Sequence, residues 1–218
     1  MPLEAKANLC YEYGLRERGF TQIAGLDEAG RGAWAGPVVV GAVILPLDRF
    51  DLAHVLEGVN DSKQLSAAMR ESLLPRIVEV AVATSVGFAS HTDIDDLGIV
   101  PATRLAMRRA LEGLAVWPDA LLTDAIDMPE IDLPCTSLTK GDQKSLSIAA
   151  ASIIAKVTRD QFMDELDELF PQYGFLVHKG YGTTLHQYAL RLYGPTPLHR
   201  MTFAPLQKDS GHETGPGS

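Results

Sequence analysis

Cysteine is scarce in this sequence, and long apolar runs are absent. Only two of the 218 residues are cysteine, Cys10 and Cys135, and they belong to no Cys-x-x-Cys pair. Neither a disulfide framework nor a zinc site is therefore expected. No apolar run approaches the roughly 20 residues that a membrane-spanning helix needs, and residues 1–10 lack the apolar core of a signal peptide. These absences exclude the disulfide-rich and membrane-spanning classes and predict a cytoplasmic protein.

Positive charge is also in short supply. The formal net charge at pH 7 is −9, which argues against a nucleic-acid partner because phosphate binding depends largely on cations. The distribution of charge weakens that argument. Residues 171–207 contain no Asp or Glu, and they carry Lys179, Arg191 and Arg200 among several tyrosines. This segment is either a face that binds nucleic acid or an aromatic-rich subdomain that packs on itself, and its composition supports both interpretations equally.

The pattern of apolar residues predicts strands and helices in one domain of fair size. Strands rich in Val and Ile are predicted over residues 23–27, 38–45 and 80–89. The short apolar run 120–124 and the segment 135–139, which has a weaker signal, are two further predicted strands. Helices are predicted over residues 66–80, 93–113 and 145–170. Ser66 and Asp93 are the expected N-caps of the first two helices, and Pro75 is expected to kink or restart the first. Small residues early in the third helix should let it lie close against a sheet, and Pro171 ends it.

The order of these elements predicts an α/β fold with a mixed sheet. Residues 1–170 are expected to form the main domain and residues 171–207 a helical C-terminal extension. Residues 208–218 are polar and Gly-rich, and they are expected to form a disordered tail. Active sites of such folds gather at the ends of strands. The acids at predicted strand ends are therefore the first candidates for function.

Two adjacent acids, Asp27 and Glu28, stand where the first predicted strand meets a glycine-rich bend. Side chains alternate across a strand, so these two can share one site only if the backbone changes course there, which Gly30 and Gly32 permit. Arg31, between the glycines, offers a planar fork suited to phosphate. This pattern indicates metal-assisted phosphoryl chemistry. Taken alone, it is more typical of a strand end followed by a solvated turn.

Four acids recur at predicted strand or loop ends. They are Asp27, Glu28, Asp124 and Asp142. Hard oxygen ligands in such a cluster suit Mg²⁺ or Mn²⁺. In a two-metal site the ions lie roughly 3.5–4 Å apart and assist an in-line attack by water. Either of the last two acids, taken singly, is more typical of a helix cap or a turn residue, so only their joint placement argues for a metal site.

Several short motifs stand between residues 22 and 206 in the order and spacing of a known family. The motifs are Asp27-Glu28-Ala29-Gly30-Arg31-Gly32, Ala35-Gly36-Pro37-Val38-Val39, Asn60-Asp61-Ser62-Lys63, Gly141-Asp142, residues 147–160 and His178-Lys179-Gly180-Tyr181-Gly182-Thr183. Together they resemble bacterial ribonuclease HII. The related ribonuclease HIII carries an extra N-terminal domain, whereas hardly more than twenty residues precede the first predicted strand here. Ribonuclease HII is therefore the better match.

The resemblance implies a ribonuclease H-like fold, with a mixed central sheet flanked by helices and a small helical C-terminal extension that binds substrate. It implies an endonuclease that hydrolyses the RNA strand of RNA–DNA hybrids. It also implies incision of duplex DNA 5′ to an embedded ribonucleotide, which leaves 3′-hydroxyl and 5′-phosphate ends. By motif position, Asp27, Glu28, Asp124 and Asp142 match the family's catalytic ligands for two Mg²⁺ or Mn²⁺ ions.

The same resemblance implies how substrate is bound. Gly30-Arg31-Gly32 matches the segment that reads the ribose 2′-hydroxyl through backbone groups, and this hydroxyl distinguishes RNA from DNA. Tyr181 matches the tyrosine that packs on the sugar at the RNA–DNA junction. Lys63 and Lys144 fall where the family contacts phosphate. The expected partners are RNA–DNA hybrids and DNA duplexes containing ribonucleotides; a monomer suffices, and nothing in the sequence indicates a sliding clamp.

One departure from the family pattern concerns the third carboxylate. The family has Val-Asp-Gly there, and this chain has Thr123-Asp124-Ala125. Alanine strains a position that needs positive φ but costs little elsewhere. Asp127, three residues on, is the alternative ligand. Asp124 is preferred because it ends an apolar run and lies eighteen residues before Asp142 (142 − 124), close to the family's spacing.

Other motif residues are expected to be structural. Ala and Ser residues in segment 147–160 should pack against the sheet, so Ser152, Lys156 and Asp160 are not taken as catalytic. The three histidines at positions 178, 186 and 199 should be surface or hydrogen-bonding residues, because hard-metal sites prefer oxygen. Two rival functions stay open: a nuclease of the same fold class that cuts all-DNA substrates, and a protein that binds hybrids without cutting.

Overall fold

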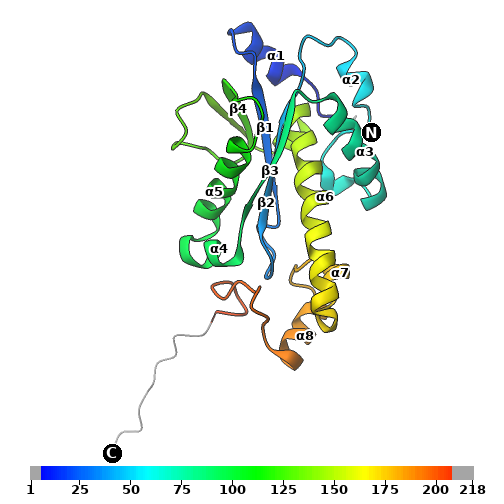
Figure 1. Cartoon of the computed structure of the whole chain (residues 1–218), viewed down its shortest axis with the longest axis vertical. Helices are drawn as coiled ribbons and strands as arrows, with labels where there is room; N and C mark the ends of the chain where they lie inside the picture. The colour runs from blue at the N-terminus through cyan, green and yellow to red at the C-terminus, as the bar shows by residue number, and fades with distance from the viewer. Residues whose placement is uncertain (1–5, 208–218) are drawn as a thin grey trace, which may run out of the picture.

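A mixed five-stranded sheet forms the centre of the molecule in a computed structural model that describes residues 6–207 (Figure 1). Its strands are β1 (Ile23–Ala29), β2 (Val38–Ile44), β3 (Ala83–Ala89), β4 (Ala120–Asp124) and β5 (Cys135–Leu138). The spatial order is β3-β2-β1-β4-β5. The pairs β1–β2 and β2–β3 are antiparallel, whereas β1–β4 and β4–β5 are parallel. The predicted α/β fold with a mixed sheet is therefore confirmed.

Helices cover both faces of the sheet and both of its ends. They are α1 (Cys10–Glu17), α2 (Leu52–Val55), α3 (Ala67–Val80), α4 (His91–Leu97), α5 (Ile99–Glu112), α6 (Leu146–Leu169), α7 (Phe175–His178) and α8 (Thr184–Tyr193), with the 3₁₀ helices η1 (Ser62–Gln64), η2 (Gly141–Gln143) and η3 (Pro171–Tyr173). Figure 1 shows α5 and α6 on opposite sides of the sheet. Each encloses an apolar core against it. Within residues 6–207, no helix combines the length and apolar character that crossing a membrane requires.

Helix α6 lies unusually close to the sheet because both partners are small. A Cβ atom added to Gly25 on β1 would clash with the backbone of Ser147, and one added to Gly41 on β2 would clash with the carbonyl oxygen of Ala151. Ser145 caps the helix by accepting a hydrogen bond from the amide of Ile148 at 3.2 Å. The packing expected from the small residues of this segment is confirmed, and the helix end next to η2 is held firmly against β1.

Some predicted element boundaries were wrong. Helix α3 reaches Val80 without interruption at Pro75, so β3 starts at residue 83 rather than 80. Ser90, rather than Asp93, is the N-cap of α4, while Asp93 is the third residue of a capping box. The predicted helix 93–113 is two helices, because Gly98 with φ 82° separates α4 from α5. Helix α1 had no clear signal in the sequence.

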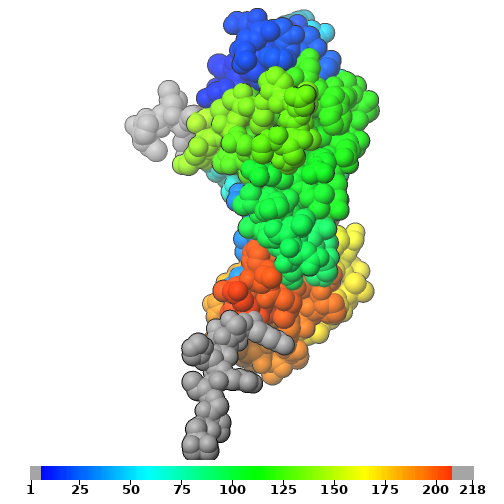
Figure 2. Space-filling model, turned by 90° about the vertical axis from the view of Figure 1, so that its left-hand side faces the viewer, coloured from blue at the N-terminus to red at the C-terminus, as the bar shows by residue number. Residues whose placement is uncertain are grey.

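Residues 171–207 pack against the far end of α6 and the loop after β1. A third apolar core joins Ala35 and Met163 of the main body to Tyr173, Phe175 and Ala189 of the extension. In the space-filling view the orange C-terminal segment lies below the green helices, at the end opposite the blue N-terminus (Figure 2). The division into domains at residue 170 stays a prediction. The tail predicted at 208–218 lies outside the described residues.

Candidate active site

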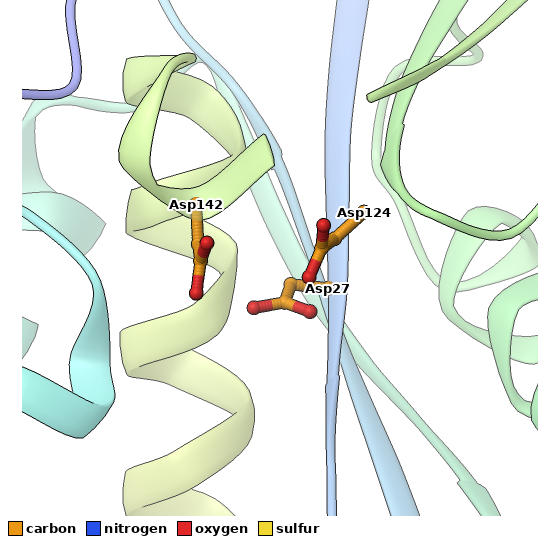
Figure 3. Close-up of side chains that lie close together, drawn as sticks. All are labelled: Asp27, Asp124 and Asp142. Carbon is orange, nitrogen blue, oxygen red and sulfur yellow. The ribbon is translucent and has the colours of Figure 1, made fainter. Parts of the chain in front are cut away.

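Three of the four predicted acids meet at one edge of the sheet. Asp27 comes from β1, Asp124 ends β4, and Asp142 lies in η2 just before α6 (Figure 3). One carboxylate oxygen of each residue lies within 4.8 Å of the others. The parallel pairing of β1 with β4 places Leu26 opposite Thr123, so the acids that follow them stand side by side. Within residues 6–207 this is the one group of three or more acidic, His or Cys residues placed to hold a metal ion.

Hydrogen bonds fix the position of Asp124. Its Oδ1 accepts from the amide of Gly141 at 2.8 Å, which ties the end of β4 to the turn that carries Asp142. The following amide, of Ala125, donates to Leu138 at 3.1 Å. Ala125 has φ 54°, so this position does adopt the conformation that favours glycine. Asp127 is exposed and outside the cluster, whereas Asp124 is part of it.

The cluster is buried and repels itself. Asp27 is only 2% exposed and Asp142 only 3%. Burial, followed by the charges of Glu28 and Asp124, raises the pKa of Asp27 well above its usual range. Burial and the neighbouring Asp61 raise the pKa of Asp142. Such a site favours the binding of cations. Its donors are all carboxylate oxygens, the ligands that Mg²⁺ and Mn²⁺ prefer.

Glu28 is separate from the three aspartates. Strand β1 runs straight through Glu28 to Ala29, and the change of course comes later, at Gly30 with φ 95°. Glu28 Oε1 accepts from Arg31 Nη1 at 3.2 Å, whereas Oε2 is buried without a hydrogen-bond partner in the described part of the chain. Burial raises the pKa of Glu28 and Arg31 opposes the shift. An orphaned buried carboxylate oxygen beside the cluster fits a ligand to a cation or to its bound water.

Lys63 and Asp61 both lie next to Asp142. Lys63 Nζ lies 3.5 Å from Asp142 Oδ2, and its side chain is 70% exposed. Burial lowers the pKa of Lys63, but the charges of Asp27 and Asp142 outweigh this and the net shift is upward. Asp61 is buried and accepts from the Lys63 amide at 2.9 Å and from Gln143 Nε2 at 3.1 Å. Sequence reasoning missed Asp61, although the motif Asn60-Asp61-Ser62-Lys63 contained it.

The two glycines that flank Arg31 have different surroundings. A Cβ atom added to Gly30 would clash with the guanidinium of Arg159. A Cβ atom added to Gly32 would meet nothing within 4 Å, and Gly32 is exposed. The positive φ and the contact with Arg159 therefore both require glycine at position 30. Position 32 is open toward solvent, on the side where a ligand would approach.

Tyr181 faces two cations of α6. The Arg159 guanidinium lies 5.3 Å from the centroid of its ring, and Lys156 Nζ lies 6.0 Å away. Tyr181 is 36% exposed, which leaves part of the ring free for contact. Lys179 is half-buried in an ion pair with Asp164. Tyr181 thus lies where residues 171–207 meet α6.

Part of the charge and aromatic content of residues 171–207 is used for packing. Arg200 is fully buried, and the rings of Tyr173 and Phe175 stack with centroids 5.5 Å apart. The histidines are buried rather than on the surface: His186 Nε2 lies 2.9 Å from His199 Nε2, and the His178 ring stacks on that of His186. Hydrogen bonding was the correct half of that prediction. A core of packed aromatic rings thus accounts for part of the segment's composition, while Tyr188 and Tyr193 are exposed.

The segment 147–160 is structural in the ways expected. Ser152 Oγ donates to the Ala149 carbonyl at 2.9 Å, as a helical serine often does. Lys156 Nζ lies 2.6 Å from Asp160 Oδ1, one helical turn further on. Asp160 also pairs with Arg70 of α3 at 3.4 Å. None of the three belongs to the aspartate cluster.

Comparison with known proteins identifies relatives over most of the chain. The family model described as ribonuclease HII matches residues 24–206. Ribonuclease HII of Chloroflexus aurantiacus is 54% identical over 199 residues, which cover 91% of this chain and 94% of that protein. Ribonuclease HII of Roseiflexus castenholzii is 56% identical over 188 residues, covering 86% and 84% respectively.

Solved structures show the same fold. Ribonuclease H2 from Pyrococcus horikoshii matches with a TM-score of 0.73 and 26% identity over 86% of this chain and 96% of that one. RNase HII of Archaeoglobus fulgidus, solved as a complex with PCNA, matches with a TM-score of 0.68 and 29% identity over 84% and 95% of the two chains. Bst-RNase HIII in complex with Mn²⁺ has a TM-score of 0.67 at 23% identity over 85% and 68%, a likeness of fold.

Proposed function

Because this chain belongs to the ribonuclease HII family of hydrolytic nucleases, we propose that it hydrolyses the RNA strand of RNA–DNA hybrids. We extend the proposal to duplex DNA, which it incises 5′ to an embedded ribonucleotide to leave 3′-hydroxyl and 5′-phosphate ends. The observation that carries the proposal is the convergence of Asp27, Asp124 and Asp142 at one sheet edge.

Asp27, Asp124 and Asp142, with Glu28 beside them, are the residues that would hold two Mg²⁺ or Mn²⁺ ions. Two divalent ions, when bound, supply an activated water and a stabilised leaving oxygen for in-line hydrolysis. The donor set fits them, since all four groups are carboxylates, Asp27 and Asp142 are buried, and Oε2 of Glu28 is a buried oxygen without a hydrogen-bond partner within residues 6–207. The protein's own contribution is rigid placement: the amide of Gly141 holds Asp124, and α6 supports the turn that carries Asp142.

The remaining predicted residues would bind substrate around this cluster. Exposed Lys63 is close enough to the cluster to neutralise a phosphate there. The open space beside Gly32 allows a nucleic-acid backbone to approach, and the half-exposed Tyr181 offers a ring on which a sugar can pack. Arg31 is engaged by Glu28, so its side chain also shields an acid close to the site.

Two glycine substitutions test the substrate-reading role of this loop. Gly32→Ala is expected to fold with an unchanged melting temperature and to lose cleavage of a duplex holding one ribonucleotide, because the new methyl group fills the approach to substrate. Gly30→Ala is the matched control: it is expected to lower the melting temperature, since its Cβ clashes with Arg159 and its φ is positive. Wild-type cleavage rates by Gly32→Ala would contradict the proposal.

The same assay separates the rival functions. Equal cleavage of all-DNA duplexes by the wild-type protein would indicate a general nuclease. Tight binding of hybrids with no turnover in Mg²⁺ or Mn²⁺ would indicate a binding protein. The proposal requires cleavage that depends on metal and on a ribonucleotide.

A further inference from the structure

Arg200, near the end of the described chain, is a buried cation with an unusual set of partners. It is fully buried, and its Nη1 and Nε donate to the carbonyl oxygens of Arg31 at 2.9 Å and Gly36 at 3.0 Å. Its Nη2 is buried without a hydrogen-bond partner, and no carboxylate within residues 6–207 forms an ion pair with it. Burial and the nearby Arg159 lower the pKa of Arg200 to about 9, which leaves the guanidinium charged at neutral pH. Burying a charge without an acid partner costs free energy, so the burial of the Arg200 guanidinium needs an explanation.

Arg159 of α6 holds the same loop from the other side. It too is fully buried, and it donates to the carbonyl oxygens of Pro37 at 3.0 Å, Ala35 at 3.1 Å and Lys179 at 2.9 Å. Two guanidiniums together therefore hold four carbonyl groups of segment 31–37. The two arginines thus hold this loop through its carbonyl groups.

The peptide between Arg31 and Gly32 shows what Arg200 does for the site. In a planar trans peptide the C=O and N–H bonds point in opposite directions. Because the Arg31 carbonyl points at the buried Arg200, the Gly32 N–H must point away from it. That N–H donates to no acceptor within residues 6–207, and Gly32 is exposed with open space beside its Cα. An unpaired backbone donor is thus presented on the open side of the loop.

We infer that Arg200 is a positioning residue for ribonucleotide recognition: by holding the Arg31 carbonyl, it fixes the Gly32 N–H as a donor to the ribose 2′-hydroxyl oxygen. The inference rests on the proposed function, which supplies the ribonucleotide. It adds that selectivity for RNA depends on a residue 169 positions away in sequence that does not touch substrate. Loss of this positioning removes one hydrogen bond that an all-DNA duplex never makes.

Binding measured in chelator, where a metal-dependent enzyme cannot cut, tests this inference. The affinities to compare are those for a duplex with one ribonucleotide and for the same duplex in all-DNA form. Arg200→Met is expected to reduce the preference for the ribonucleotide about tenfold, which corresponds to the loss of about 1.4 kcal/mol, with unchanged affinity for all-DNA duplex. Arg200→Lys, which keeps the charge and can reach one carbonyl, should lose less. Tyr173→Phe removes a buried hydrogen bond to Gly194 elsewhere in the extension and should keep the full preference.

A second measurement uses the wild-type protein and is independent of how the variants fold. The Gly32 amide should exchange rapidly with solvent in the free protein and become protected when the ribonucleotide duplex binds, but not when all-DNA duplex binds. Full preference in folded Arg200→Met, or no protection of the Gly32 amide, overturns the inference. If the wild-type protein shows no ribonucleotide preference at all, the proposed function fails instead, and the two failures are distinct.

Discussion

Replacing Ala125 with glycine is expected to stabilise the protein without impairing the site. Ala125 adopts φ 54°, and its Cβ is exposed, so glycine removes strain and gives up no packing. The left-handed conformation costs an L-residue about 1–2 kcal/mol, while the greater freedom of glycine in the unfolded chain costs about 0.5–1 kcal/mol. The difference predicts a gain of about 0.5–1 kcal/mol. For a chain of this size, that gain corresponds to a rise of about 1–4 °C in melting temperature.

Urea unfolding of the wild-type and Ala125→Gly proteins measures this gain directly, provided that the two proteins share the same m-value. Cleavage activity should stay within about twofold of wild type, because Asp124 is held by the Gly141 amide and not by the side chain of residue 125. A loss of stability in Ala125→Gly would refute the view that this position is strained. An equal gain from Ala125→Ser would also refute it, since serine keeps the Cβ.

Three further predictions concern buried charge. Burial lowers the pKa values of His186 and His199 to about 4, below the unfolded value near 6.5. The free energy of unfolding should therefore be highest above pH 6.5 and fall, by up to about 3 kcal/mol for each histidine, as the pH drops toward 4. Urea unfolding at pH 7 and pH 5 measures this loss, and equal stabilities would contradict it. Asp27→Asn should abolish cleavage yet raise the melting temperature of the metal-free protein at pH 7, because the pKa of Asp27 is raised and its ionised form is disfavoured. In calorimetry the gain should shrink as the pH falls toward the ordinary pKa of 3.8 and vanish well below it, where the aspartate is protonated in both folded and unfolded states. Glu12 of α1 is buried against the start of α6, where it accepts from Ser145 Oγ and from the amide and Oγ of Ser147. Glu12→Ala should therefore cost about 3–5 kcal/mol in urea unfolding, and Glu12→Gln, which keeps an acceptor, clearly less.

The elements with the strongest local signals were predictable from the sequence. The Val- and Ile-rich strands and the long helix α6 stand within a few residues of their predicted limits because apolar periodicity and caps fix them locally. Asp27, Asp124 and Asp142 were predictable as a group since each stands at a predicted strand or loop end, and parallel strands end at the same edge of a sheet. Their meeting is a consequence of topology, which the strand order already implies.

What escaped prediction depends on contacts between distant segments. The sequence placed Asp27 and Glu28 together, but the strand continues through both and only the first joins the cluster. The burial of Arg200 and of the three histidines could not be read from composition, because polar residues are usually exposed unless tertiary partners satisfy them. The partners of Arg200 are carbonyl groups 164 and 169 positions away in the chain. Those of the histidines include backbone carbonyls, Thr196 and one another, 3 to 13 positions away.

The most direct test of the whole account is the cleavage of an end-labelled DNA duplex that holds one ribonucleotide, with an all-DNA duplex beside it. The wild-type protein and Asp124→Asn are compared in Mg²⁺, in Mn²⁺ and in chelator. The account predicts a single cut 5′ to the ribonucleotide that requires both metal and Asp124, leaves an end that a DNA polymerase can extend, and spares the all-DNA duplex. Equal cutting of both duplexes, or wild-type cutting by Asp124→Asn, would contradict it.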